Sequence, residues 1–545
     1  MGATDSTTAI EHGAIQDGTD AVARLEGQGR WFDALGVLRH SLRSGSAVDA
    51  ATLHILGRLL QRLEARDKAR RAYHQALRLD PSRAVTYNNL ALLELAGLNA
   101  QLAERWLLKG LNLPGLSLDQ ADLLHATACE LYLYLLRPER ALHFVELQLQ
   151  RRVSNMALSN RAICCHKLGL YAQAVASQEQ AIALLLQHVA PALLSVPLPQ
   201  LVARFLGDVE QSCQLQAQLM NLAIYRLLVN PDDSDGLQLL LAGTANGSAC
   251  WLDPRRSGTR WRGQSVDRLI LWDDQGYGDS IQNLAFIQMA ALRAKSVEVW
   301  MRPSLLSLVQ ERCTLPRNVR LLSLTQTEAP WAQNSYQLGL FFLPMVLDAW
   351  PRQRSRPREP WLRRRRNPDA SPSKRVGLVW SAGRHTAPQP ERSARVRDVP
   401  FAQLWDHAMQ WRQKHKVECV SLQLEGHDDP VVAAQIQSGL LRIGLSSCDW
   451  LATAAVLETM DLVVSVDTSV AHLAGALGVP CVLLLSAPAD WRWGQQGPAT
   501  PLYGSFGLAR CQARDDWNSA LQQADEWLAK MLESSCCDSA VMSQI

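Results

Sequence analysis

The spacing of apolar residues divides the chain into a helical part and a mixed part. Between about residues 18 and 187, apolar and small residues recur at helical spacing in units of about 34 residues. The clearest unit carries Leu53, Leu56, Gly57, Leu60, Ala69, Tyr73, Ala76 and Pro81, and a second clear copy centres on Ala162. A single unit cannot bury its own apolar face, so the pattern predicts a solenoid of about five stacked helix pairs.

The C-terminal part alternates short apolar runs with helical stretches, which is typical of a parallel α/β sheet. Its clearest segment predicts a strand at Leu462–Val466, a helix at Ala471–Leu477 and a second strand at Cys481–Leu485. Gly478 is expected to end the helix, because glycine readily adopts the left-handed backbone conformation found there. Between the first strand and the helix stand three polar residues of types that cap helices, namely Asp467, Thr468 and Ser469.

A second strand, turn and helix are predicted earlier in this part. The strand covers Arg268–Asp273, the helix runs from about Ile281 to Ala294, and Gly276 and Gly278 lie in the turn between them. Glycine in such a turn permits close approach of a ligand to the backbone. The turn lacks the third glycine of a dinucleotide-binding fingerprint. Glu298, about twenty residues further on, keeps a dinucleotide-dependent oxidoreductase open as an alternative.

Both turns lie where parallel sheets bind ligands, at the carboxyl ends of the strands. The N-terminus of a helix offers unpaired N–H groups and the positive end of a dipole, which favour a phosphate. Thr468 and His472 are four residues apart and share one helix face, so the imidazole can reach a phosphate or sugar oxygen. The alternative is that Asp467 and Thr468 only cap the helix, and that His472 bonds to neighbouring backbone.

Composition adds few constraints. The chain has 545 residues, of which 47% are hydrophobic and 20% charged, and this indicates an ordinary globular protein with several domains. Its net charge of +3 is too small to indicate a nucleic-acid or membrane binder. No apolar run approaches the ~20 residues of a membrane helix, and the polar N-terminus lacks a secretory signal, so we expect a cytoplasmic location. The 12 cysteines form no CxxC pair, and we expect no structural metal. The basic run Arg363–Arg366 is interpreted as part of a linker rather than a nucleic-acid site, because no aromatic stacking residues accompany it.

Two segments of the C-terminal part resemble a known family. The segment that begins at Asp467 reads DTSVAHLAGALGVP and is followed, after an apolar strand, by DWRW. It resembles the C-terminal lobe of GT-B glycosyltransferases. The closest resemblance is to the heptosyltransferase-like domain (glycosyltransferase family 9) fused to tetratricopeptide (TPR) repeats in bacterial proteins, and a more distant one is to O-linked N-acetylglucosamine transferases. The segment GDSIQ resembles the start of the N-terminal lobe, in which the aspartate is the proposed base that faces the acceptor. In this chain that residue is Asp279, and the alternative is that Asp279 caps its helix.

The resemblance implies a fold class and a domain order. The fold is an α-helical TPR solenoid followed by α/β structure, with two Rossmann-like lobes in the GT-B arrangement. The expected order is a disordered N-terminus (1–17), the TPR solenoid (18–187), a helical connector (188–264), the N-lobe on the acceptor side (265–350), an Arg/Pro-rich linker (351–373), the C-lobe on the nucleotide-sugar side (374–533) and a tail (534–545).

The resemblance also implies which residues bind the nucleotide-sugar. They are Gly276, Gly278, Ser280, Gln282, Gly383, Arg397, Gln423, Asp467, Thr468, Ser469 and His472. Two positions depart from the family's pattern, since Asp398 stands in place of a hydroxyl residue and Ala452 in place of an acidic one. Trp491 and Trp493 either shape the pocket or belong to the core.

The expected function is sugar transfer from a nucleotide-sugar to a protein or glycan acceptor. We expect an inverting reaction that needs no metal and no cofactor beyond the donor, because arginines and a helix dipole can stabilise the leaving diphosphate. The repeats would recruit the acceptor or a protein partner through their concave groove. The alternative is a catalytically inactive TPR scaffold that carries a vestigial transferase domain.

Overall fold

The structure, a computed structural model, describes residues 20–43, 48–204, 209–242, 259–325, 335–349, 359–365, 373–382 and 397–534. The predicted disordered N-terminus, the tail from residue 535, most of the Arg/Pro-rich linker and Gly383 lie outside the described residues. The chain forms two compact units, Met1–Leu168 and Gly169–Ile545.

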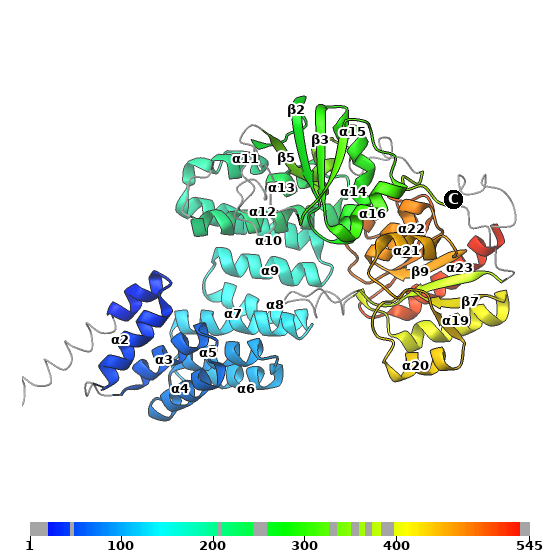
Figure 1. The fold of residues 1–545 in the computed structure, drawn as a ribbon. Helices are drawn as coiled ribbons and strands as arrows, with labels where there is room; N and C mark the ends of the chain where they lie inside the picture. The colour runs from blue at the N-terminus through cyan, green and yellow to red at the C-terminus, as the bar shows by residue number, and fades with distance from the viewer. Residues whose placement is uncertain are drawn as a thin grey trace, which may run out of the picture. The chain divides into compact units, whose positions relative to one another are not determined.

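The first unit contains the helical repeats (Figure 1, blue to cyan). Its helices are α2 (Trp31–Arg43), α3 (Ala50–Arg62), α4 (Arg66–Leu79), α5 (Ala84–Ala96), α6 (Ala100–Leu111), α7 (Leu118–Tyr134), α8 (Pro138–Arg151) and α9 (Asn155–Lys167). They pack in successive pairs, α3 with α4, α5 with α6 and α7 with α8. The predicted small residue Gly57 lets α3 approach α4, because a Cβ atom there would lie 2.5 Å from Cε1 of Tyr73. The predicted TPR-type helix pairs are therefore confirmed.

The second unit opens with a helical layer. It comprises α10 (Tyr171–Val189), α11 (Leu198–Arg204), α12 (Val209–Val229) and α13 (Ser234–Ala242). Helix α10 packs on α12, α12 on α13, and α13 on α17 (Leu343–Val346) of the first sheet domain. The repeat predicted around Ala162 draws on α9 and α10, which belong to different units.

The N-lobe is a five-stranded parallel sheet in the order β1-β5-β2-β3-β4. Its strands are β1 (Thr259–Arg260), β2 (Val266–Trp272), β3 (Ala294–Met301), β4 (Val319–Ser323) and β5 (Tyr336–Gly339). The helix after β2 is not the single one predicted. It begins earlier, as α14 (Tyr277–Asn283), and the 3-10 turn Leu284–Phe286 separates it from α15 (Ile287–Ala291). This turn places Leu284 and Phe286 in the apolar core. Helix α16 (Pro303–Arg312) follows β3.

The C-lobe is a six-stranded parallel sheet in the order β11-β10-β9-β6-β7-β8. Its strands are β6 (Arg375–Val379), β7 (Glu418–Ser421), β8 (Leu441–Ile443), β9 (Leu462–Val466), β10 (Cys481–Leu485) and β11 (Phe506–Arg510). Its helices are α19 (Phe401–His415), α20 (Pro430–Gln437), α21 (Trp450–Leu457), α22 (Ser469–Leu477) and α23 (Trp517–Ser534). The two strands predicted on either side of the helix Ala471–Leu477 are confirmed with their predicted bounds, as β9 and β10. Two parallel α/β sheets after a helical region agree with the expected GT-B lobes.

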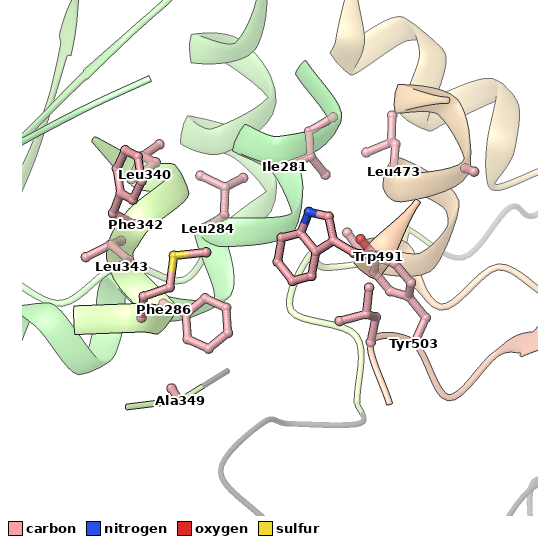
Figure 2. Close-up of a cluster of buried hydrophobic side chains, with 14 of the residues drawn as sticks. Ile281, Leu284, Phe286, Leu340, Phe342, Leu343, Ala349, Leu473, Trp491 and Tyr503 are labelled. Carbon is pink, nitrogen blue, oxygen red and sulfur yellow. The ribbon is translucent and has the colours of Figure 1, made fainter. Parts of the chain in front are cut away.

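The two lobes share one apolar core. Figure 2 shows Trp491 of the C-lobe among side chains that include Ile281 and Leu284 of the N-lobe and Leu473 and Tyr503 of the C-lobe. Trp491 and Trp493 are both buried, and neither lines the cavity described below. Of the two roles left open for these tryptophans, the structure supports the core.

Candidate functional site

A cavity of about 1160 Å³ lies between the two lobes of the second unit. The N-lobe lines it with the turn Gly276–Asp279, and the C-lobe with Asp467–Val470 and His472. The two predicted turns therefore face the same space. They meet because α14 packs directly on α22.

Helix α22 begins at the cavity, as predicted. Thr468 is its N-cap residue, with extended backbone, and its hydroxyl accepts a hydrogen bond from the N–H of Ala471 at 3.5 Å. The same hydroxyl also forms a hydrogen bond with the hydroxyl of Ser465 in β9, with the two oxygen atoms 3.2 Å apart. Gly478 ends the helix in the left-handed conformation, at φ +71°. Thr468 and Ser469 both line the cavity, so this helix N-terminus faces the cavity, and the end of a helix that carries free N–H groups favours an anion.

His472 lies in the first turn of α22 and is held from three sides. Its Nδ1 atom lies 2.7 Å from the hydroxyl of Tyr503, and its ring stacks on Trp493 with the centroids 5.4 Å apart. Its Nε2 atom lies 3.7 Å from Oδ1 of Asp467. Burial lowers the pKa of His472, although the carboxylate of Asp467 opposes the shift. Burial thus favours the neutral form of the imidazole, and the ring contacts side chains rather than the neighbouring backbone.

Asp279 lies at the N-lobe side of the cavity and makes two contacts. Its Oδ2 atom accepts a hydrogen bond from the N–H of Gly276 at 3.1 Å, so the residue does cap its own helix. Its Oδ1 atom accepts from the guanidinium of Arg492, which belongs to the C-lobe. The carboxylate remains about one-fifth exposed. The helix-capping contact and a partly exposed position in the cavity lining are thus both observed for this residue.

Three other predicted residues of this turn have different surroundings. Gly278 lines the cavity, and a Cβ atom there would lie 2.6 Å from Cδ2 of His472, so the glycine permits the close approach of α14 to α22. Ser280 is fully buried behind the turn and donates to Asp273, which in turn pairs with Arg302. Gln282 is also buried, at 1% exposure. Neither Ser280 nor Gln282 lines the cavity.

The remaining predicted residues lie on the C-lobe side. Arg397 lines the cavity, with Nη1 at 3.5 Å from Oδ2 of Asp467. Gln423 follows β7 and accepts hydrogen bonds from the N–H groups of Trp380 and Ser381, at 3.2 and 3.1 Å, so it supports the loop after β6. Gly383 of that loop lies outside the described residues.

The two departures from the family's pattern also have defined places. The carboxylate of Asp398 accepts from the N–H of Ala382 at 2.8 Å, so it too supports the loop after β6. Ala452 is exposed in the first turn of α21, whose cap is Asp449. Glu298, the acid of the dinucleotide alternative, pairs with Arg268 at 2.9 Å on the N-lobe sheet.

The sequence prediction missed Arg492 and Asp490. Both line the cavity, and they pair with each other at 2.9 Å. Although burial opposes the shift, the guanidinium of Arg492 lowers the pKa of Asp490. One signal was available, because the DWRW segment places an arginine between two tryptophans just after an apolar strand.

The described residues include no cluster of three or more histidine, cysteine, aspartate or glutamate side chains arranged to hold a metal ion. Among the helices in the described ranges, none is both long enough and apolar enough to cross a bilayer.

Comparison with known proteins finds a family match for part of the C-lobe. Residues 445–516, which contain β9, α22 and the DWRW segment, match the family described as glycosyltransferase family 9 (heptosyltransferase). The chain is also similar to a thermophilic TPR protein of Thermus thermophilus, with 16% identity over 38% of this chain and 98% of that one and a TM-score of 0.30. It is similar to PilF of Pseudomonas aeruginosa, with 15% identity over 42% of this chain and 98% of that one and a TM-score of 0.30. No curated protein matches the chain.

The helix pairs of the first unit and the family match in the second agree with the predicted combination. The chain joins a helical region of TPR-type pairs to a C-terminal part in which residues 445–516 match glycosyltransferase family 9 (heptosyltransferase).

Proposed function

We propose that the second unit transfers a sugar from a nucleotide-sugar donor to a protein or glycan acceptor. The observation that carries the proposal is the single cavity shared by the α22 N-terminus and the Asp279 carboxylate. The turn at the α22 N-terminus is suited to the diphosphate of the donor, and the turn that ends at Asp279 offers a base for the acceptor. The proposed transfer uses both. The repeats of the first unit would recruit the acceptor or a protein partner.

The donor diphosphate would lie at the N-terminus of α22. The residues proposed to hold it are Thr468, Ser469, His472 and Arg397, together with backbone N–H groups of the helix. The imidazole of His472 can bond to a sugar or phosphate oxygen through Nε2. The positive helix end and the arginines would stabilise the negative charge of the departing diphosphate, without a metal.

Asp279 would act as the general base. As the acceptor oxygen forms its bond to the anomeric carbon, its proton passes to the Asp279 carboxylate, and the bond from the anomeric carbon to the diphosphate oxygen breaks with its electron pair. A single displacement of this kind inverts the configuration of the sugar.

The test separates the base from the donor site. Asp279→Asn is expected to abolish transfer, with a loss of at least about 10²-fold, while calorimetry still detects the nucleoside diphosphate bound by the wild type. Loss of nucleotide binding together with transfer would contradict the assigned role. Thr468→Ala is the matched variant, because it should weaken nucleotide binding and leave the base in place.

The scaffold alternative has two observations in its favour. The proposed base is engaged with Arg492, and Ala452 stands where the family has an acid. A panel of UDP-, GDP- and ADP-sugars that shows neither binding nor hydrolysis would favour a scaffold. Mass spectrometry of proteins and glycans from cells with and without the gene would reveal a lost sugar mass if the chain is a transferase.

A further inference from the structure

Arg492 lines the cavity and forms ion pairs with carboxylates of both lobes. It lies in the 3-10 turn Trp491–Trp493 of the C-lobe, and its side chain is 15% exposed. Its guanidinium pairs with Asp279 of the N-lobe and, at 2.9 Å, with Asp490 of the C-lobe. It also lies 5.3 Å from the ring centroid of Phe341, so aromatic and carboxylate contacts fix its position.

The described lining of the cavity is rich in carboxylates. Besides Asp279 and Asp490 it includes Asp467, which also interacts electrostatically with Arg492. Arg397 and Arg492 are the two arginines of this described lining, and each is paired with a carboxylate. A diphosphate that enters next to the α22 N-terminus must therefore compete with protein carboxylates for these guanidinium groups.

We propose that Arg492 is a positioning residue shared between Asp279 and the donor diphosphate. This inference rests on the proposed transferase function. It adds that the donor binds before Asp279 can accept the acceptor's proton. The arriving diphosphate draws the guanidinium away from Asp279, and the Oδ1 atom of that carboxylate is then open to the acceptor's proton. Before the donor arrives, Arg492 occupies Oδ1 and the N–H of Gly276 occupies Oδ2, so the base is engaged on both oxygens.

Shared use of one guanidinium predicts an unusual effect of the Asp279→Asn substitution. The neutral amide competes less for Arg492, so the nucleoside diphosphate should bind about threefold to tenfold more tightly than to the wild type. Arg492→Gln should weaken the same binding by about tenfold to hundredfold. In the Arg492→Gln background, Asp279→Asn should bring no further tightening, because the competition no longer exists.

The measurement is calorimetric titration of the full chain with ADP, GDP and UDP, for the wild type, both single variants and the double variant. Arg442→Gln is the matched control, since Arg442 is an exposed arginine, 61% exposed, that pairs with Glu418 on the C-lobe sheet. It should leave nucleotide binding unchanged. Circular dichroism of each variant checks the fold, and Arg492→Lys, which keeps the charge, should bind with intermediate affinity.

The outcomes separate this inference from the proposed function. If Asp279→Asn leaves binding unchanged or weakens it without abolishing it, or if the tightening persists without Arg492, the shared role is overturned while the transferase proposal stands. Complete loss of binding in Asp279→Asn contradicts both the shared role and the assigned base. If the wild type binds none of the three diphosphates, both are overturned. Steady-state kinetics give a second reading, because the shared role requires the donor to bind before the acceptor, and random binding would contradict it.

Discussion

At the scale of single residues, burial changes the pKa of a carboxyl close to the cavity. Asp274, next to the proposed base turn, accepts a hydrogen bond from the N–H of Phe341 at 2.9 Å and lies against Gly339, where any Cβ would collide with its carboxylate. Burial raises the pKa of Asp274 to about 7. The Phe341 N–H opposes this rise, while the Asp279 and Asp273 carboxylates add to it. The carboxyl of Asp274, close to Asp279, thus has a pKa raised toward neutral pH.

This residue predicts a pH dependence of stability. The folded state keeps the proton of Asp274 up to about pH 7, whereas the unfolded chain loses it near pH 4, so the free energy of unfolding should fall as pH rises between these values. Asp274→Asn removes that fall, and the urea midpoint should then differ less between pH 5 and pH 8 than in the wild type. Asp267→Asn, at an 82% exposed carboxylate paired with Lys295, is the control that should not change the difference. An unchanged pH dependence in Asp274→Asn would contradict the assignment.

At the scale of elements, the cavity exists because two helix N-termini approach each other. The contact between α14 and α22 is made at Gly278, whose missing side chain leaves room for the ring of His472. That ring cannot move aside easily, because Tyr503 and Trp493 hold it on its other sides.

A methyl group at this contact should therefore be costly. In Gly278→Ala the new Cβ would lie 2.6 Å from Cδ2 of His472, and we expect a loss of about 1–3 kcal/mol in the free energy of unfolding, together with weaker nucleotide binding. Gly36→Ala in α2 is the control, because a Cβ there would have no described atom within 4 Å apart from its chain neighbours and the backbone of its own helix. Chemical denaturation measures both. A Gly278→Ala variant as stable as the control would show that α14 and α22 separate freely.

At the scale of the whole molecule, the described structure of the second unit joins its lobes through a buried ion pair as well as an apolar core. Arg312 at the end of α16 donates to Glu458 after α21 at 2.5 and 3.2 Å, and both side chains are almost fully buried. The linker joins the same group, since the N–H of Arg365 donates to Glu458 at 2.7 Å. Two residues of the basic run interpreted as a linker, Arg363 and Arg365, thus donate backbone hydrogen bonds to Arg312 and Glu458, the two members of this ion pair.

Removal of one partner should leave a buried charge uncompensated. Glu458→Gln is expected to lower the free energy of unfolding of the second unit by about 3–5 kcal/mol. Glu418→Gln, at a half-exposed carboxylate that pairs within the C-lobe sheet, should cost less than about 1 kcal/mol. Hydrogen exchange should show β2 and β9 losing protection together in Glu458→Gln. Loss in one lobe only would indicate that the lobes unfold independently.

Local rules were sufficient for much of this protein. The helical repeat, the strands β9 and β10, the Thr468 cap and the Gly478 stop all follow from residue types at short spacing, because capping, glycine conformation and apolar periodicity act within a few residues. The family resemblance in the same segment agrees with the match over residues 445–516. The sequence alone therefore predicted the two turns that line the cavity.

Tertiary structure decided which side chains of those turns face the cavity. Ser280 and Gln282 share a motif with Asp279 but point into the core, because packing against the sheet sets the rotation of so short a helix. Arg492 reaches Asp279 across 213 residues of sequence, and Arg312 reaches Glu458 across 146. Pairings of this kind leave no local pattern, since they depend on how the two sheets pack against each other. Packing energy is a property of the whole interface rather than of any segment.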